Sequence, residues 1–154
     1  MESTPGKNFI KVSSIIMLIG GPISAISSLQ GMAASAQFDR VIPIAVSWSL
    51  VYLLFLLVAV YQVFLGINGV AYCNVPEKAE KLRILGTICL VLASIVMLVN
   101  MITLSQIGAG TNAVTSIFGL TMPIIFMVGA DKNYRAQTED NQDEDQDEDQ
   151  YGDY

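Results

Sequence analysis

Five of the seven charged residues between positions 12 and 130 fall in one stretch, GINGVAYCNVPEKAEKLRILG, residues 66–86. A carboxylate beside a lysine can move protons, and a group of cations can bind an anion. The stretch is therefore either a binding site or a turn that joins two membrane helices. Its candidate residues are Asn74, Pro76, Glu77, Lys78, Lys81 and Arg83.

Other residue types that support catalysis are scarce. The sequence has no histidine, the commonest general base and metal ligand. Cys73 and Cys89 match neither a CxxC redox motif nor a metal cluster. The many Ser and Thr residues have no neighbouring group to activate a nucleophile. We predict a protein that is not an enzyme, without catalytic residues, metal ligands or a cofactor.

The composition is that of a membrane protein. Hydrophobic residues make up 53% of the chain and charged residues 14%, whereas soluble domains carry about a quarter charged residues. Four apolar segments come near the length of about 20 residues that a bilayer requires. They cover about 12–34, 42–66, 84–104 and 111–130, and none contains a charged residue. The predicted fold is an all-α integral membrane protein with a four-transmembrane-helix domain over 12–130.

The basic residues predict the orientation. Seven of the eight Lys and Arg lie in residues 1–11, in the connection between the second and third spans, or after the fourth span. Cytoplasmic loops carry such an excess. We expect a plasma-membrane protein with residues 1–11 and 131–154 both cytoplasmic. An alternative reads ASA at 34–36 as a cleavage site, and a cut after Ala36 would leave three spans.

The first span carries small residues on one face. Gly20, Ser24 and Ser28 recur every four residues, with Gly31 close to the same face. Small residues let helices approach closely in membranes, and Asn100 in the third span can hydrogen-bond across helices. These helix-packing candidates serve either the bundle of one molecule or a homo-oligomer face.

The C-terminal segment is strongly acidic. Residues 136–154 contain nine acids and no base. A segment with high like charge and no hydrophobic periodicity cannot bury enough apolar surface to order itself. We predict a disordered tail over 131–154, which serves either as a solvating brush or as a docking segment for a basic cytoplasmic partner.

The 66–86 stretch can also be explained as a helix start. Pro76 is favoured in the first turn of a helix. Asn74 or Val75 would then lie near the N-cap, and Asn74 is the better chemical candidate. Glu77 with Lys81 and Glu80 with Arg83 have the spacing of helical ion pairs. The three basic residues of this stretch also lie where anionic headgroups are found.

The same stretch resembles part of a group of small uncharacterised multi-pass membrane proteins of bacteria. These share a glycine-rich helix end, then Asn-x-Pro-Glu-Lys-Ala, then Leu-Gly at the start of the next span. The resemblance implies a bacterial plasma membrane and an all-helical four-pass bundle. It implies no activity, and it does not include the acidic tail.

The leading functional hypothesis is a scaffold or accessory subunit of a membrane complex. Its partners would be the lipid bilayer and a membrane protein or a second copy, and no nucleic acid. The alternative is a passive channel or transporter component lined by neutral polar residues, namely Ser24, Ser27, Ser28, Asn100 and Thr103. A membrane enzyme is a third hypothesis, and it requires a pocket with an activated group in the 74–83 loop.

Overall fold

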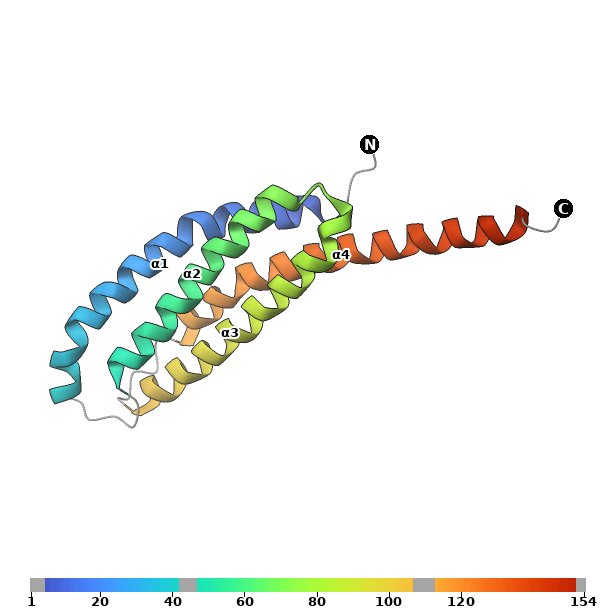
Figure 1. Ribbon diagram of the computed structural model, residues 1–154. Helices are drawn as coiled ribbons and strands as arrows, with labels where there is room; N and C mark the ends of the chain where they lie inside the picture. The colour runs from blue at the N-terminus through green and yellow to red at the C-terminus, as the bar shows by residue number, and fades with distance from the viewer. Residues whose placement is uncertain (1–4, 42–46, 107–112, 152–154) are drawn as a thin grey trace.

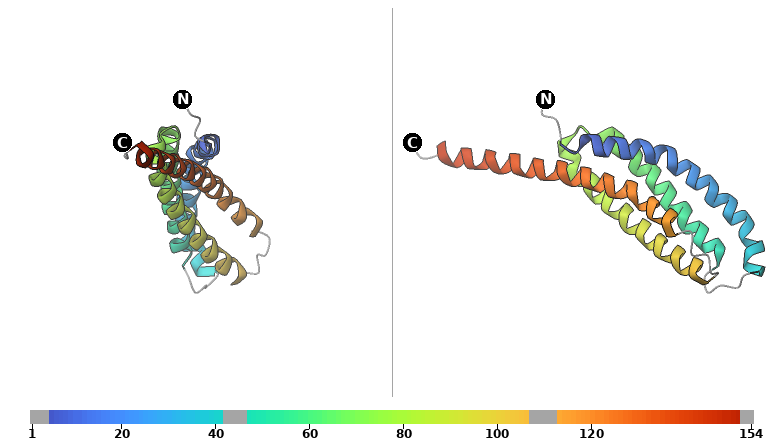
Figure 2. Two further views of the ribbon diagram at one scale, coloured as in Figure 1. Left: turned by 90° about the vertical axis from the view of Figure 1, so that its right-hand side faces the viewer. Right: turned by 180° about the vertical axis from the view of Figure 1, so that it is seen from behind.

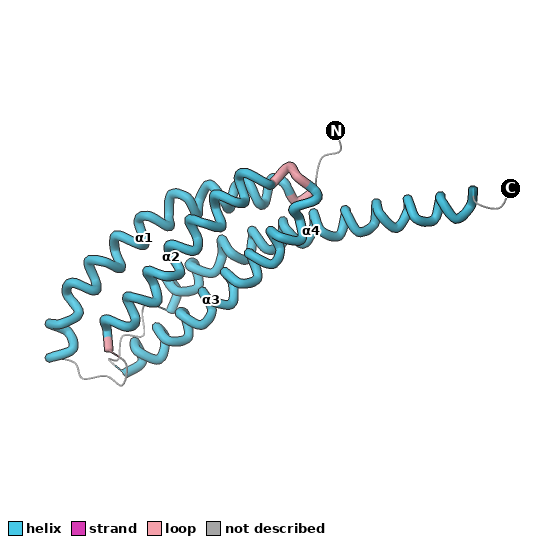
Figure 3. Tube along the Cα trace, in the orientation of Figure 1, coloured by secondary structure: helices cyan, strands magenta, loops and turns pink. Residues whose placement is uncertain are grey.

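The computed structural model describes the backbone of residues 5–41, 47–106 and 113–151, and the side chains of residues 5–35, 47–103 and 120–139. Its elements are α1 (Lys7–Val41), α2 (Trp48–Tyr72), the 3-10 helix η1 (Pro76–Lys78), α3 (Ala79–Gln106) and α4 (Ala113–Tyr151). The described residues contain no strand (Figure 3). The all-α class predicted from the sequence is confirmed.

The helices form an up-and-down bundle in which each helix runs antiparallel to the one before it (Figure 1). Helix α1 contacts α2 and α4, and α3 also contacts α2 and α4, so the four helices form a closed ring. The start of α1, the η1 turn and the start of α3 lie at the same end of the bundle. Helix α4 passes this end and continues well beyond it (Figures 1 and 2).

Three segments are long and apolar enough to cross a membrane: Lys7–Ser35, Trp48–Tyr72 and Pro76–Thr103. The fourth predicted span, 111–130, is not confirmed. Its residues 113–130 form the first part of α4, while residues 111–112 and the side chains up to residue 119 lie outside the described part of the chain.

Helices α1 and α2 pack through small residues at seven-residue spacing. Buried small residues recur at this spacing on both helices: Ser14, Gly21, Ser28 and Ser35 on α1, and Ala59 and Gly66 on α2, followed by Cys73 at its C-cap. A Cβ atom on Gly66 would lie 2.9 Å from the Ser14 carbonyl oxygen. At the far end the Ser35 and Ser49 hydroxyls are 2.6 Å apart. Seven-residue spacing keeps one face toward its partner along a left-handed crossing, so the two backbones stay close along their length.

The structure divides the small-residue face predicted for the first span. Ser28 is buried and Gly31 contacts the Tyr52 ring of α2. Ser24 is exposed, and no atom lies within 4 Å of a Cβ built on Gly20. Four-residue spacing advances about 40° around a helix at each step, so residues spaced in this way leave the face that α2 covers.

Among the described side chains, Phe126 of α4 is the largest that is fully buried. Its ring lies against two glycines, Gly69 of α2 and Gly86 of α3, whose missing side chains leave the room that it occupies. Ile10, Met17, Leu65 and Leu82 belong to the same buried cluster. The core therefore joins all four helices in the half of the bundle nearest the chain's N-terminal end.

The acidic segment is helical up to Tyr151, so the predicted disorder of 131–154 is not confirmed. The prediction treated the segment as an isolated chain. In the structure it extends a helix that packing has already formed, and extension avoids the cost of nucleation. Residues 152–154 and the side chains beyond Glu139 lie outside the described part.

Candidate functional site

The basic residues gather at the end of the bundle from which α4 projects, which we call the basic end. They are Lys7 and Lys11 of α1, Lys78 of η1, Lys81 and Arg83 of α3, and Lys132 and Arg135 of α4. Three acids, Glu77, Glu80 and Asp131, lie among them. Up to Arg135, positive charge therefore exceeds negative charge at this end, and the remaining acids follow on the projecting part of α4. The side chain of the eighth base, Arg40, lies outside the described residues.

Three of these cations lie over aromatic rings, and each pair connects two neighbouring helices. The Lys81 ammonium is 5.3 Å from the Tyr72 ring centre, which joins α3 to the end of α2. The Arg83 guanidinium is 4.2 Å from the Tyr134 ring centre on α4. Lys132 of α4 lies 4.8 Å from the Phe9 ring centre on α1. Such cation–π contacts hold a cation in place without neutralising its charge.

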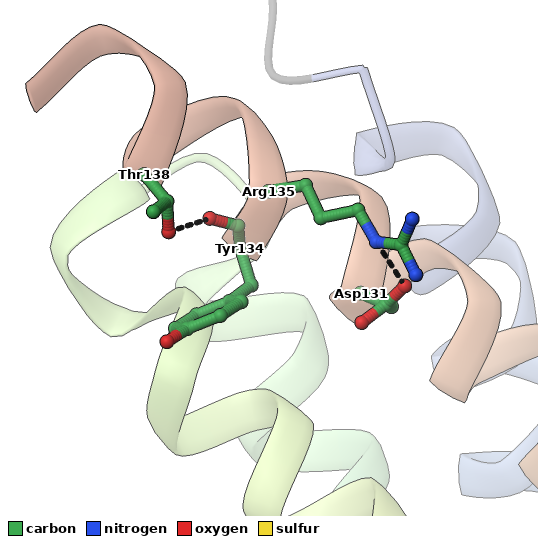
Figure 4. Close-up of polar contacts among 4 residues, drawn as sticks. All are labelled: Asp131, Tyr134, Arg135 and Thr138. Carbon is green, nitrogen blue, oxygen red and sulfur yellow. Dashed lines mark hydrogen bonds and ion pairs between the residues drawn. The ribbon is translucent and has the colours of Figure 1, made fainter. Parts of the chain in front are cut away.

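The ion pairs predicted within the 74–83 loop are not formed. Among the described side chains the one ion pair joins Arg135 and Asp131, 2.8 Å apart on α4. Figure 4 shows that this pair and the Tyr134 ring leave α4 in different directions. Glu77 belongs to a 3-10 turn rather than to α3. The 3-10 turn changes the spacing between Glu77 and Lys81. Glu80 and Arg83 both belong to α3, but the guanidinium of Arg83 lies over the Tyr134 ring of α4 instead.

The loop itself is a short turn. Pro76 occupies the first helical position of η1, as predicted. The residue that precedes it as N-cap is Val75, which makes no side-chain cap hydrogen bond, and Asn74 is exposed. Lys78 and Glu77 are exposed as well. The loop therefore presents its polar side chains outward and does not enclose a pocket around them.

The sequence did not reveal one contact at this end. The backbone N–H of Gly6 donates to the Asn133 side-chain oxygen at 2.6 Å, and both residues are buried. Gly6 also lies against the Gly129 carbonyl, closer than any side chain would permit. Asn133 falls in the segment predicted to be disordered, so no pattern marked it as buried. The contact fastens the start of α1 to α4 where the acidic helix leaves the bundle.

The neutral polar residues differ in exposure. Ser24 and Ser27 are exposed on α1, while Ser28 is buried and donates to the Ser24 carbonyl. Thr103 of α3 is buried and donates to the Val99 carbonyl. Asn100 is half-buried on the same helix. The hydroxyl groups of Ser27, Ser28 and Thr103 therefore all donate to carbonyl groups of their own helices.

The described residues contain no group of three His, Cys, Asp or Glu side chains placed to hold a metal ion. Cys73 and Cys89 are buried, and neither forms a disulfide. The feature that the geometry does present is a set of fixed, largely unneutralised positive charges. A comparison with protein families, curated proteins and solved structures finds no match to this chain.

Proposed function

We propose that this chain is a small integral membrane protein that acts as a scaffold or accessory subunit of a membrane complex. In this proposal it lies in a plasma membrane with its basic end and acidic helix in the cytoplasm. The membrane location in this proposal is supported by the three apolar helices. Their outer faces expose large apolar side chains, such as Ile19 at 62% and Leu98 at 60%. Lipid would cover these faces.

The observation that carries the scaffold role is the course of α4. This helix is fixed to the basic end by Asn133 and Tyr134 and then carries the acidic segment away from the bundle (Figure 1). A rigid base under a projecting charged helix suits the recruitment of a basic partner. The channel alternative has less support, because Ser24 and Ser27 are exposed on α1 and the hydroxyl groups of Ser27, Ser28 and Thr103 donate within their own helices.

The proposal is tested by cross-linking in native membranes followed by identification of the captured proteins. Two chains are compared with the wild type: one truncated after Arg135, and one of full length with every Asp and Glu after residue 136 changed to Asn and Gln. We expect both to lose the same basic partner. An unchanged set of cross-linked proteins in both chains would contradict the scaffold role.

A further inference from the structure

Three cations surround the basic end at the seams between helices. Lys81 marks the seam of α2 with α3, Arg83 that of α3 with α4, and Lys132 that of α4 with α1. The fourth seam, between α1 and α2, is closed by small residues. We call Lys81, Arg83 and Lys132 the cation girdle.

The girdle cations retain their capacity to bind an anion. None of them pairs with a carboxylate among the described side chains, where Arg135 holds Asp131. Lys81 and Lys132 are exposed and Arg83 is half-buried. A guanidinium or ammonium over a ring still directs N–H donors away from the ring. The aromatic rings thus reduce the mobility of the cations and leave their hydrogen bonds to an external partner.

The surface beside the girdle is apolar. Ile84 follows Arg83 directly and is 52% exposed, and Val128 lies one turn before Lys132 and is 45% exposed. Val12, 56% exposed, lies one turn beyond Phe9 on α1. A ligand that fits both the cations and the apolar residues beside them has a negatively charged group joined to an apolar part. An inorganic anion would satisfy only the cations.

The chain's own acidic helix does not occupy the girdle in this structure. Helix α4 carries that segment outward from the basic end, and no bend returns it to the bundle (Figure 2). The described part of the chain therefore leaves the girdle open to an external anion.

We propose that the cation girdle binds the headgroups of anionic phospholipids, whose acyl chains lie along the adjoining apolar faces. This inference rests on the membrane insertion contained in the proposed function. It adds a lipid class and three residues that select it.

The test is lipid retention by the full chain. The protein is reconstituted in nanodiscs of equimolar phosphatidylcholine and phosphatidylglycerol and released in mild detergent, and its bound lipids are counted by native mass spectrometry. We expect the wild type to retain phosphatidylglycerol in preference to phosphatidylcholine. The variant K81Q/R83Q/K132Q loses this preference, by about fivefold for each cation removed.

The matched control is K7Q/K11Q/K78Q, which removes the same charge from the same end without touching a cation–π pair. We expect it to keep most of the preference, as should the charge-preserving variant K81R/R83K/K132R. If the triple girdle variant does not fold, the exposed single variants K81Q and K132Q carry the test.

Four results would overturn the inference. They are the absence of a lipid preference in the wild type, equal loss in the control and girdle variants, unchanged retention in the girdle variants, and displacement of the lipid by inorganic phosphate alone. Membrane insertion is measured separately, as resistance to extraction by alkaline carbonate. If the wild type and the girdle variant both resist extraction but the wild type shows no lipid preference, this inference is wrong. The membrane location of the proposed function would still hold.

Discussion

Gly69 shows how a single missing side chain supports the core. A Cβ atom there would lie 2.6 Å from the Phe126 ring and would also overlap the Ser14 hydroxyl. Gly69→Leu must therefore displace α1 or α4. Overpacking of this kind costs about 1–3 kcal/mol, so we expect a lower midpoint of thermal unfolding in detergent.

The control is Gly20→Leu, at a position where no atom lies within 4 Å of a built Cβ. Both substitutions gain the same helix propensity, so their difference reports the steric contact alone. Equal midpoints for the two variants would contradict the packing described for Phe126.

Asn133 makes the second contact that depends on one side chain. Asn133→Ala leaves the buried Gly6 N–H without its acceptor, at a cost of about 1–3 kcal/mol. We expect faster hydrogen exchange in the first turn of α1, where the Ile10 N–H donates to the Gly6 carbonyl. Asn8→Ala, at an exposed position, is the control and should leave this exchange unchanged. Equal exchange in both variants would count against the Gly6–Asn133 contact.

Local reasoning predicted some of these residues and missed others. Pro76 begins a helical turn because its ring fixes a backbone angle suited to the first turn of a helix. This preference belongs to a single residue, so the sequence alone predicts it. The spacing of three or four residues predicts ion pairs of Lys81 and Arg83 with acids of the same stretch, because this rule applies only to residues within one helix. Their ring partners, Tyr72 and Tyr134, belong to α2 and α4, so only the packing of the bundle could identify them.

The helices themselves were predicted well where apolar runs are long. The runs at 12–34 and 84–104 lie within α1 and α3, and residues 48–66 of the run at 42–66 lie within α2. Helix α1 begins earlier, at Lys7, because Gly6 is fastened to α4. That contact joins distant parts of the chain, so the pattern of apolar residues along the sequence cannot predict it.

The extension of α4 beyond Glu139 gives a prediction about a whole element. Truncation after Glu139 removes residues 140–151 of a helix. We expect the far-UV ellipticity per molecule to fall, while the unfolding midpoint of the bundle stays unchanged because this segment projects away from it (Figure 1).

The matched control is the full-length chain with Asn141→Pro, which breaks a helix at that point without shortening the chain. We expect it to lose part of the same ellipticity. A truncated chain with undiminished ellipticity per molecule would show that the segment is not helical in solution, as the sequence alone predicted.

The molecule as a whole has two unlike ends and an apolar middle. One end holds seven basic side chains and the projecting acidic helix, while the outer faces of three helices between the ends are apolar. The composition predicted the apolar middle, and the positions of Lys and Arg along the chain predicted that these basic residues lie together at one end. The order of contacts around the ring depends on side-chain fit, such as Phe126 between Gly69 and Gly86, and composition carries no such information.

The most direct test of the proposed membrane placement is labelling with a membrane-impermeant maleimide in intact cells. Single cysteines are introduced as Ser47→Cys, Lys78→Cys and Glu139→Cys in a chain that carries Cys73→Ala and Cys89→Ala. Ser47 is exposed at the end opposite the basic end, and Lys78 and Glu139 are exposed at or beyond the basic end. We predict that only Ser47→Cys is labelled until the membrane is permeabilised, when all three react. Labelling of Lys78→Cys in intact cells at the rate of Ser47→Cys would contradict the proposed placement.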